Sequence, residues 1–359
     1  MEREVVNFDL ERDFETFKDL SISCFGPGSN LDKEMHRWLL DENPYNPDGK
    51  NLLFLLKEGE KAIGCDGLIP NELYLRGKTY LMAHSVKSMT HPDFQRQGIF
   101  RKMTENSESK GREAGVDVIL GLANAASYPA YQKFGWETLL EKEVLVKPIH
   151  IKKILKRKFK LNTVAELGDF VFTTVNKLQM KENSESLSFE WLDQVPEEVQ
   201  DCWDRYKDNY DLLLVRDYKY LHYRYNQRPD VSYHTLLVRQ YGKAVGFVIL
   251  RESKTKNSVF ASVAEFFTDP FDDKLIDAMA KALTRYAYER ELDYLVLSCG
   301  EYGNYNRVLK QNSFRPTPKP ASNNMMIARI LNEDIRVEDL KRPQSWHLSQ
   351  GEGDVELDL

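Results

Sequence analysis

The chain lacks the features that mark secreted, membrane-spanning and nucleic-acid-binding proteins. Its four cysteines in 359 residues form no Cys-x-x-Cys pair. His84 and His91 form no metal site with a carboxylate at ligand spacing, and the other histidines are far apart in sequence, so we expect neither a disulfide framework nor a metal site. No apolar run approaches the roughly 20 residues of a membrane span, and the acidic start of the chain leads to no signal-peptide core. A net charge of -6 argues against a general role on nucleic acid. We therefore expect a cytoplasmic protein with no membrane or nucleic-acid partner.

What is present is the composition of a globular protein large enough for two domains. Hydrophobic residues make up 42% of the chain and charged residues 30%, and 359 residues exceed what one ordinary core organises. Changes in composition along the chain, from mixed segments to a basic segment and a polar run, predict a first domain over 1–146 and a helical linker over 147–190. A second domain is expected over 191–332 and a tail over 333–359.

The most informative stretch runs from His84 to Trp136 and contains a short polar loop, QRQGIF at 95–100, that becomes a helix at Gly98. Backbone N–H groups at such a helix start converge on the positive end of the helix dipole, where a diphosphate binds well. Gly98 lets the backbone approach an anion closely, and Arg96 and Arg101 add positive charge nearby. The pattern therefore predicts a diphosphate site.

The segments around this loop predict a layer of strands with flanking helices. Asp9 is a suitable N-cap for a first helix, and a second helix is expected over 31–41. The helix that follows the loop is expected to extend to about residue 114. The expected strands lie at 3–8, 51–57, 61–68, 72–75, 80–90 and 116–122.

This stretch resembles the GNAT superfamily of N-acetyltransferases. The family's phosphate loop has the pattern Gln/Arg-x-x-Gly-x-Gly/Ala, which Gln95 and Gly98 match and Phe100 does not. Farther on, Asn124, Tyr131 and the FGW of 134–136 resemble the family's Asn…Tyr-x-x-x-Gly-Phe segment, with Trp in place of Phe. Loop and segment occur in order and about one βαβ unit apart, which carries more weight than a glycine loop alone.

The resemblance implies an α/β (α+β) fold in which two central parallel strands part and the pantetheine arm of the cosubstrate acetyl-CoA lies between them. It assigns coenzyme contacts to the strand before the loop, to the loop and helix start, and to the end of the neighbouring strand. The residues so assigned are Ser88, Met89, Thr90, Gln95, Arg96, Gln97, Gly98, Ile99, Phe100, Arg101 and Asn124.

Tyr131 is the residue that the resemblance assigns as catalytic acid. A phenol pKa of about 10 is near the roughly 8.5 of a thiol, so protonation of the departing thiolate would be close to balanced. A backbone amide around Met89 or Thr90 would polarise the thioester carbonyl. For the base, three alternatives stay open: His84 on the central strand, a chain of water molecules, and the C-terminal carboxylate of Leu359.

The second half of the chain repeats the layout of the first without its chemistry. The spacing from Pro92 to Gly135 recurs between Pro270 and Ser313, with strand and helix segments in the same order. The counterparts of Gly98, Asn124 and Tyr131 are Ile276, Tyr302 and Leu309. Asp269, Asp272 and Asp273 give the second loop a negative charge that repels a diphosphate. We expect two GNAT-like mixed-sheet domains with flanking helices, the second of them degenerate.

Two basic segments have alternative interpretations. The segment 151–160 has an apolar stripe and six cations, which suits a membrane-surface helix or, as we favour, a connecting helix. The run YKYLHYRYNQR at 218–228 could stack on nucleic acid or sugar, but its spacing also fits a packed amphipathic helix, which we favour.

The sequence thus predicts an N-acetyltransferase that moves an acetyl group from acetyl-CoA to a primary amine of a small molecule. An amino sugar, an aminoglycoside-like amine or a peptide amine would fit. One alternative is a noncatalytic acyl-CoA-binding or regulatory module. Another is an aminoacyl-tRNA-dependent peptidyltransferase of the same tandem fold, which would need no diphosphate loop. The sequence has no evident charged coiled-coil hairpin of the kind that such transferases carry.

Overall fold

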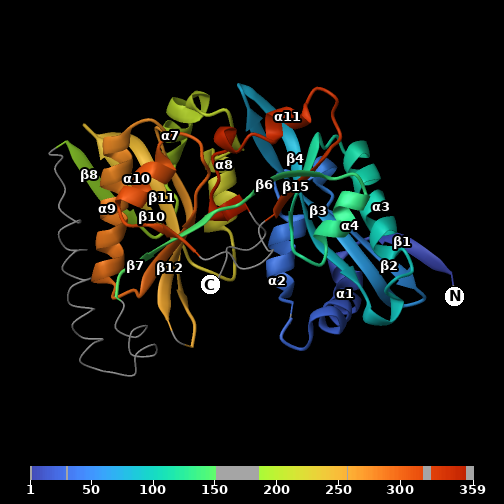
Figure 1. The fold of residues 1–359 in the computed structure, drawn as a ribbon. Helices are drawn as coiled ribbons and strands as arrows, with labels where there is room; N and C mark the ends of the chain where they lie inside the picture. The colour runs from blue at the N-terminus through green and yellow to red at the C-terminus, as the bar shows by residue number, and fades with distance from the viewer. Residues whose placement is uncertain (1, 30, 151–185, 257, 318–324, 353–359) are drawn as a thin grey trace. The chain divides into compact units, whose positions relative to one another are not determined.

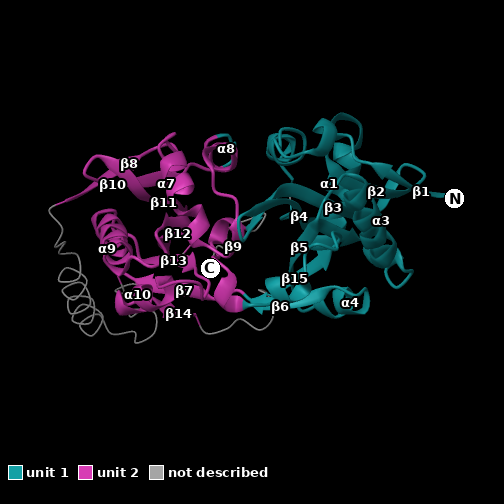
Figure 2. Ribbon diagram, turned by 90° about the horizontal axis from the view of Figure 1, so that it is seen from above, with its two compact units in different colours: residues 1–141, 227–230, 321–342 teal, residues 142–226, 231–320, 343–359 magenta. Residues whose placement is uncertain are grey.

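The computed structural model describes residues 2–29, 31–150, 186–256, 258–317 and 325–352 (Figure 1). The chain forms two compact units, which are coloured separately in Figure 2. Unit 1 comprises residues 1–141, 227–230 and 321–342, and unit 2 comprises residues 142–226, 231–320 and 343–359. Each unit contains a mixed β-sheet with packed helices, which confirms the expected α+β class with two sheets.

The sheet of unit 1 has the strand order β1-β2-β3-β4-β5-β15-β6. β4 and β5 are parallel, and the other neighbours are antiparallel. The strands predicted at 61–68 and 72–75 form one long strand, because Pro70 and Asn71 keep their register with β4. The bounds are β1 (Arg3–Asn7), β2 (Leu52–Glu58), β3 (Lys61–Leu75), β4 (Lys78–Thr90), β5 (Val118–Ala123), β6 (Glu137–Glu141) and β15 (Met325–Ile330).

The helices of unit 1 begin close to where the sequence predicts. The Asp9 carboxylate accepts a hydrogen bond from the Arg12 N–H and caps the first helix as expected. The bounds are α1 (Leu10–Phe25), α2 (Lys33–His36) with a π turn over Arg37–Asp41, α3 (Ile99–Glu113), α4 (Tyr128–Lys133) and α11 (Val337–Leu340).

One side of the unit 1 sheet is covered by α3 and α4. Alternate residues of β2, such as Leu52 and Phe54, are buried in the same cluster as Ile99 and Met103 of α3 and Tyr131 of α4. Because alternate side chains of a strand point to the same face, this cluster fixes which face the two helices occupy. Tyr131 therefore lies on the α3 side of the sheet.

The sheet of unit 2 has the order β14-β7-β13-β12-β11-β10-β8, in which β12 and β13 are parallel. Its strands are β7 (Val144–Pro148), β8 (Leu187–Leu192), β10 (His234–Gln240), β11 (Lys243–Lys254), β12 (Val259–Thr268), β13 (Tyr294–Ser298) and β14 (Arg315–Pro316); a short β9 spans Leu212–Leu214. Its helices are α7 (Val199–Tyr206), α8 (Tyr218–Leu221) with a π turn over His222–Asn226, α9 (Asp273–Glu289) and α10 (Tyr305–Gln311).

The two sheets follow one plan, but each takes its sixth strand from the other half of the chain. β15 lies between β5 and β6 in unit 1, and β7 lies between β13 and β14 in unit 2. The units are consequently not contiguous in sequence. The linear ranges 1–146 and 191–332 describe the order of the chain but do not anticipate this exchange of strands, which depends on pairing between residues far apart in sequence.

Of the two basic segments, the structure describes 218–228 but not 151–160. Tyr220, Tyr223 and Tyr225 are buried, as is Arg224, so the aromatic run packs within the protein and offers no row of exposed rings. Residues 151–160 lie outside the described part of the chain. Among the helices that are described, none is long and apolar enough to cross a membrane.

Candidate active site

The loop before α3 exposes an uncapped helix start. Gln95, Arg96, Gln97 and Gly98 are all exposed, and no side chain caps α3 at Gly98. Arg96 and Gly98 have left-handed backbones, with φ of 61° and 74°. Left-handed residues in a turn change the direction of successive backbone N–H groups, and such turns form concavities that bind anions. No atom other than its chain neighbours lies within 4 Å of the position that a Cβ on Gly98 would take. The first N–H groups of α3 are thus accessible to an anion.

Cations and an aromatic ring brace this loop. The guanidinium of Arg3 lies 5.6 Å from the centre of the Phe94 ring, and the Lys61 ammonium lies 5.4 Å from it. Arg3 also donates a hydrogen bond of 2.9 Å to the Gln97 side chain. Arg101, on the first turn of α3, is exposed and pairs with Glu105. Cations therefore lie around the helix start, with Arg3 also paired to Glu58 and Arg101 to Glu105.

The two parallel strands of unit 1 part beside this loop. β4 and β5 pair only from Met82–Val118 to His84–Leu120, although β5 runs on to Ala123 and pairs with β15 along its other edge over its whole length. Ser88, Met89 and Thr90 belong to the portion of β4 beyond the last pair. The edge of β4 that faces away from β3 there can accept an extended ligand as an added strand. Ser88, Met89 and Thr90 thus border the unpaired edge of β4, and their contact with the coenzyme arm stays a prediction.

A β-bulge in β4 directs two hydroxyl groups to Tyr131. Lys87 and Ser88 together oppose Asp66, and Lys87 has a left-handed backbone with φ of 56°. In a regular strand Ser85 and Ser88 would face opposite sides. With the extra residue, both reach the Tyr131 hydroxyl oxygen, Ser85 Oγ at 3.2 Å and Ser88 Oγ at 3.0 Å.

Asp66 completes this polar cluster from β3. Its side chain is buried, and Oδ1 accepts a hydrogen bond from Ser88 Oγ at 2.5 Å. Burial raises the pKa of Asp66 to about 6. Burial, followed by the charge of Asp66, raises the pKa of Tyr131 to about 12. The phenol is therefore a weaker acid than its ordinary pKa of about 10 suggests, and direct transfer of its proton to a thiolate is less balanced than the sequence argument assumed.

Aromatic packing and a turn hold Tyr131 in place. Its ring centre lies 5.2 Å from that of Phe100 and 4.7 Å from that of Trp136. Asn124 is exposed, and its side-chain oxygen accepts hydrogen bonds from the N–H groups of Ala126 and Ser127 at the start of α4. Phe100, which departs from the family pattern, thus packs on the assigned acid.

His84 occupies the last position at which β4 pairs with β5. It is partly buried, and strand alternation directs it to the face opposite Ser85 and Tyr131. The structure thus separates the two catalytic candidates by the thickness of the sheet. Leu359, the other protein candidate for the base, lies outside the described residues. Within them, no group of three His, Cys, Asp or Glu side chains is gathered as a metal site requires.

The counterpart of the helix start in unit 2 is closed. Ile276, at the place of Gly98, is fully buried, and the Asp272 carboxylate accepts a hydrogen bond from the Leu275 N–H as the cap of α9. A side-chain carboxylate therefore already occupies the position at which a phosphate would bind. Unit 2 therefore lacks the exposed, uncapped helix start that unit 1 has.

The gap between β12 and β13 is filled by the chain itself. The two strands pair only as far as Val263–Leu297. Beyond β13, a Cβ on Gly300 would collide with the Trp346 carbonyl, and a Cβ on Gly351 would collide with the Tyr225 hydroxyl. Residues 346–352 therefore lie against the parted ends of β12 and β13, the counterparts in unit 2 of β4 and β5.

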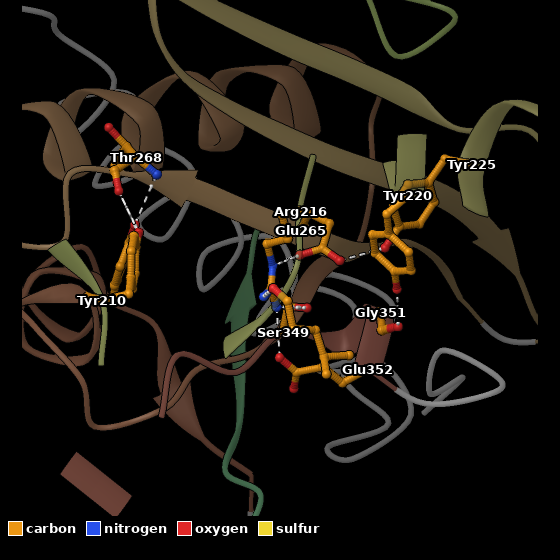
Figure 3. A network of polar contacts seen from close by, with 11 residues as sticks. Tyr210, Arg216, Tyr220, Tyr225, Glu265, Thr268, Ser349, Gly351 and Glu352 are labelled. Atoms are coloured by element: carbon orange, nitrogen blue, oxygen red, sulfur yellow. Dashed lines mark hydrogen bonds and ion pairs between the residues drawn. The ribbon is translucent and has the colours of Figure 1, made fainter. Parts of the chain in front are cut away.

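A buried ion-pair network fixes this C-terminal segment (Figure 3). The fully buried Arg216 donates hydrogen bonds of 2.7 Å to both Glu265 of β12 and Glu352, and one of 3.0 Å to Ser349. The second oxygen of Glu265 accepts a hydrogen bond from the Tyr225 hydroxyl. The network ties the end of the described chain to the centre of the unit 2 sheet.

Comparison with known families identifies the first unit. Residues 10–139 match the family model described as an acetyltransferase (GNAT) domain. This part of the chain is a GNAT acetyltransferase domain. Such a domain implies acyltransferase activity, with acyl-CoA as the donor and an amine as the acceptor. No curated protein matches the chain in sequence.

Solved structures extend the likeness over both units. A probable N-acyltransferase from Enterococcus faecalis superposes with a TM-score of 0.64 at 14% identity, covering 92% of this chain and 73% of that one. A GCN5-related N-acetyltransferase from Anabaena variabilis gives 0.65 at 13% identity with the same coverage. N-myristoyltransferase from Saccharomyces cerevisiae with bound myristoyl-CoA gives 0.58 at 13% identity, covering 91% and 82%. These likenesses show a tandem GNAT-like fold.

Sequence analysis missed three polar residues that the structure brings to prominence. Asp66 and Ser85 join Tyr131, and Arg216 organises unit 2. The signal for Asp66 was available, since it is the one acidic residue between Ala62 and Asn71 in an otherwise apolar strand. A lone carboxylate in such a strand is costly to bury and indicates a specific partner.

Proposed function

We propose that this protein transfers the acetyl group of acetyl-CoA to a primary amine of a small molecule, and that unit 1 performs the reaction. The observation that carries the proposal is the parting of β4 and β5 beside the uncapped start of α3. A coenzyme needs both features, one for its extended arm and one for its diphosphate. The acetyl group is favoured by the description of the matching family model.

The coenzyme would be held by two sets of groups. The exposed loop, Gln95 to Gly98, and the first turn of α3 with Ile99, Phe100 and Arg101 would receive the diphosphate. The edge of β4 at Ser88, Met89 and Thr90 would pair with the pantetheine arm, and Asn124 would border it at the end of β5. The first set is supported by the exposed loop and the uncapped start of α3. The second set is supported by the edge of β4 that is not paired with β5.

Reaction at the thioester needs an acid that protonates the departing thiolate and a base that accepts the amine proton. Tyr131 is proposed for the first role, because its hydroxyl is held in a polar cluster at the parted strands. For the second, His84 and a chain of water molecules are proposed as alternatives. His84 occupies the last paired position before the gap and an imidazole suits neutral pH, but it lies on the face of the sheet opposite Tyr131.

The acceptor class is tested by incubating the purified full chain with acetyl-CoA and a library of amino sugars, aminoglycosides and peptide amines, while the released thiol is measured. Tyr131→Phe is expected to lower kcat at least tenfold without weakening coenzyme binding. Tyr128→Phe is the matched control, because Tyr128 lies on the same helix and its hydroxyl contacts Thr138 instead. A full chain that neither binds acetyl-CoA in calorimetry nor releases thiol with any amine would contradict the proposal.

A further inference from the structure

Asp66, Ser88 and Tyr131 form a continuous chain of proton-bearing groups. Ser88 Oγ lies 2.5 Å from Asp66 Oδ1 and 3.0 Å from the Tyr131 hydroxyl oxygen. Asp66 is 1% exposed and Tyr131 is 5% exposed. The buried end of the chain is thus a carboxyl group, and the other end is the phenol assigned to the reaction.

The direction of these hydrogen bonds depends on the proton of Asp66. A serine hydroxyl has one hydrogen, and when Asp66 is ionised Ser88 donates that hydrogen to the carboxylate. For the contact between Ser88 and Tyr131 to stay a hydrogen bond, Tyr131 then donates to Ser88 and its proton points into the protein. Ser85 Oγ, at 3.2 Å, can donate to the same phenol oxygen. When Asp66 carries a proton, the carboxyl can donate to Ser88 and Ser88 to Tyr131, which leaves the phenol hydrogen free to point outward.

The relative acidities of the groups favour the carboxyl as the source of the proton. The pKa of Tyr131 is raised to about 12, so direct transfer to a thiolate of pKa about 8.5 is disfavoured by roughly three orders of magnitude. The pKa of Asp66 is raised to about 6, and transfer from its carboxyl is favoured by roughly two orders of magnitude. A tyrosinate beside an ionised Asp66 never has to form.

We propose that Asp66 is the proton donor of the transfer, and that Ser88 and Tyr131 relay its proton to the departing thiolate. This inference rests on the proposed function. As the C–S bond breaks, Tyr131 gives its proton to sulfur, Ser88 gives its proton to Tyr131, and the Asp66 carboxyl gives its proton to Ser88. The products are neutral CoA thiol and an Asp66 carboxylate. Asp66 regains a proton from solvent before the next turnover, while the amine proton leaves separately to the base.

The relay is tested with two matched serine variants and one aspartate variant of the full chain. Ser85→Ala and Ser88→Ala each remove one hydroxyl from Tyr131, but only Ser88 contacts Asp66. We expect Ser88→Ala and Asp66→Asn each to lower kcat about 100-fold, and Ser85→Ala to lower it by a much smaller factor. The double variant S88A/D66N should be no slower than either single variant, since both cut one path.

Two further measurements distinguish loss of the relay from misfolding of a variant. In wild-type protein, kcat at saturating amine should fall as the pH rises above about 6 and Asp66 loses its proton, and D66N should lack that fall. Difference infrared spectra of the coenzyme-free protein should contain a protonated-carboxyl band that titrates near pH 6 and is absent from D66N. The titratable groups that face Asp66 in the described chain are Tyr131 of α4, Glu108 of α3 and the neighbouring Cys65.

The outcomes separate the relay from the activity itself. Equal losses in S85A and S88A, or an unchanged pH profile in D66N, would overturn the relay while wild-type turnover still supported an acetyltransferase. Absence of turnover in the wild type would instead count against the proposed function. Calorimetric binding of CoA to each variant verifies that the losses do not come from coenzyme affinity.

Discussion

The ring of Phe100 meets the ring of Tyr131 edge-on, with centroids 5.2 Å apart and planes inclined by 84°. Phe100 lies in the first turn of α3 and Tyr131 on α4, so the contact joins the helix start to the phenol. A residue that departs from the family pattern therefore packs against the proposed acid.

Replacing Phe100 with Leu should consequently impair turnover more than stability. Leu keeps most of the buried volume, so the free energy of unfolding should fall by about 1 kcal/mol. Loss of the ring contact should lower kcat roughly tenfold, because a displaced hydroxyl no longer meets the departing thiolate. Phe134→Leu is the control, since Phe134 touches Phe100 rather than the phenol. Similar kcat values in the two variants, measured by thiol release, would refute the positioning role.

Gly98 and Gly115, at opposite ends of α3, offer a comparison that isolates coenzyme binding. Both have left-handed backbones, φ of 74° and 80°, and neither has another atom within 4 Å of a Cβ. Alanine at either position should cost about 1 kcal/mol of stability through backbone strain. Only Gly98→Ala should raise the KM for acetyl-CoA, by tenfold or more, because its methyl group occupies the approach of the diphosphate. An equal KM in both variants would mean that the diphosphate binds elsewhere.

Arg216 should be essential for the stability of unit 2. Arg216→Met leaves the buried carboxylates Glu265 and Glu352 without a cation, which should cost about 3–5 kcal/mol. Arg239→Met is the control, because Arg239 pairs with Glu190 and Glu198 at the surface and should contribute at most about 1 kcal/mol. Denaturant unfolding followed by tryptophan fluorescence measures both. A loss below 1 kcal/mol for Arg216→Met would show that the network is not structural.

Asp13 should make the protein sensitive to acid. Burial alone would raise its pKa, but hydrogen bonds from Arg12 and Lys57 outweigh this effect and hold the pKa of Asp13 far below its ordinary value. Because the folded pKa lies below the unfolded value of about 3.9, the carboxylate stabilises the fold above that pH and the benefit is lost as the pH falls.

Asp13→Asn should therefore lower the free energy of unfolding by roughly 2 kcal/mol at pH 7 and weaken its dependence on pH between about 5 and 2. Asp19→Asn, on the exposed side of the same helix, supplies the control. The measurement is the thermal midpoint of both variants over that pH range. A wild-type acid transition retained in Asp13→Asn would assign acid sensitivity to other groups.

Local patterns in the sequence predicted the parts of the site that depend on neighbouring residues. The loop at 95–100, the helix start at Gly98 and the capping of α1 by Asp9 follow from short-range rules of backbone geometry, and the structure has each of these elements in place. The sequence also predicted that the second copy lacks the phosphate loop, because Ile276 carries a side chain where glycine would let the backbone approach an anion. These features need no knowledge of long-range contacts.

The remaining parts depend on residues that are distant in sequence. The pairing of Asp66 with Ser88 requires the register of β3 on β4 and the bulge at Lys87, neither of which a periodic pattern specifies. The docking of residues 346–352 depends on Arg216, which is 136 positions from Glu352. The elevated pKa of Tyr131 follows from burial beside Asp66 and could not be anticipated from the phenol alone.

The exchange of β7 and β15 has a consequence for biosynthesis. On the ribosome, residues 1–141 emerge first, yet the strand between β5 and β6 comes from residues 325–330. The edges of β5 and β6 that face each other can pair with β15 only after almost the entire polypeptide has been translated. A nascent chain stopped before that point would expose unpaired strand edges in the unit 1 sheet, so this sheet is completed only after most of unit 2 has been translated.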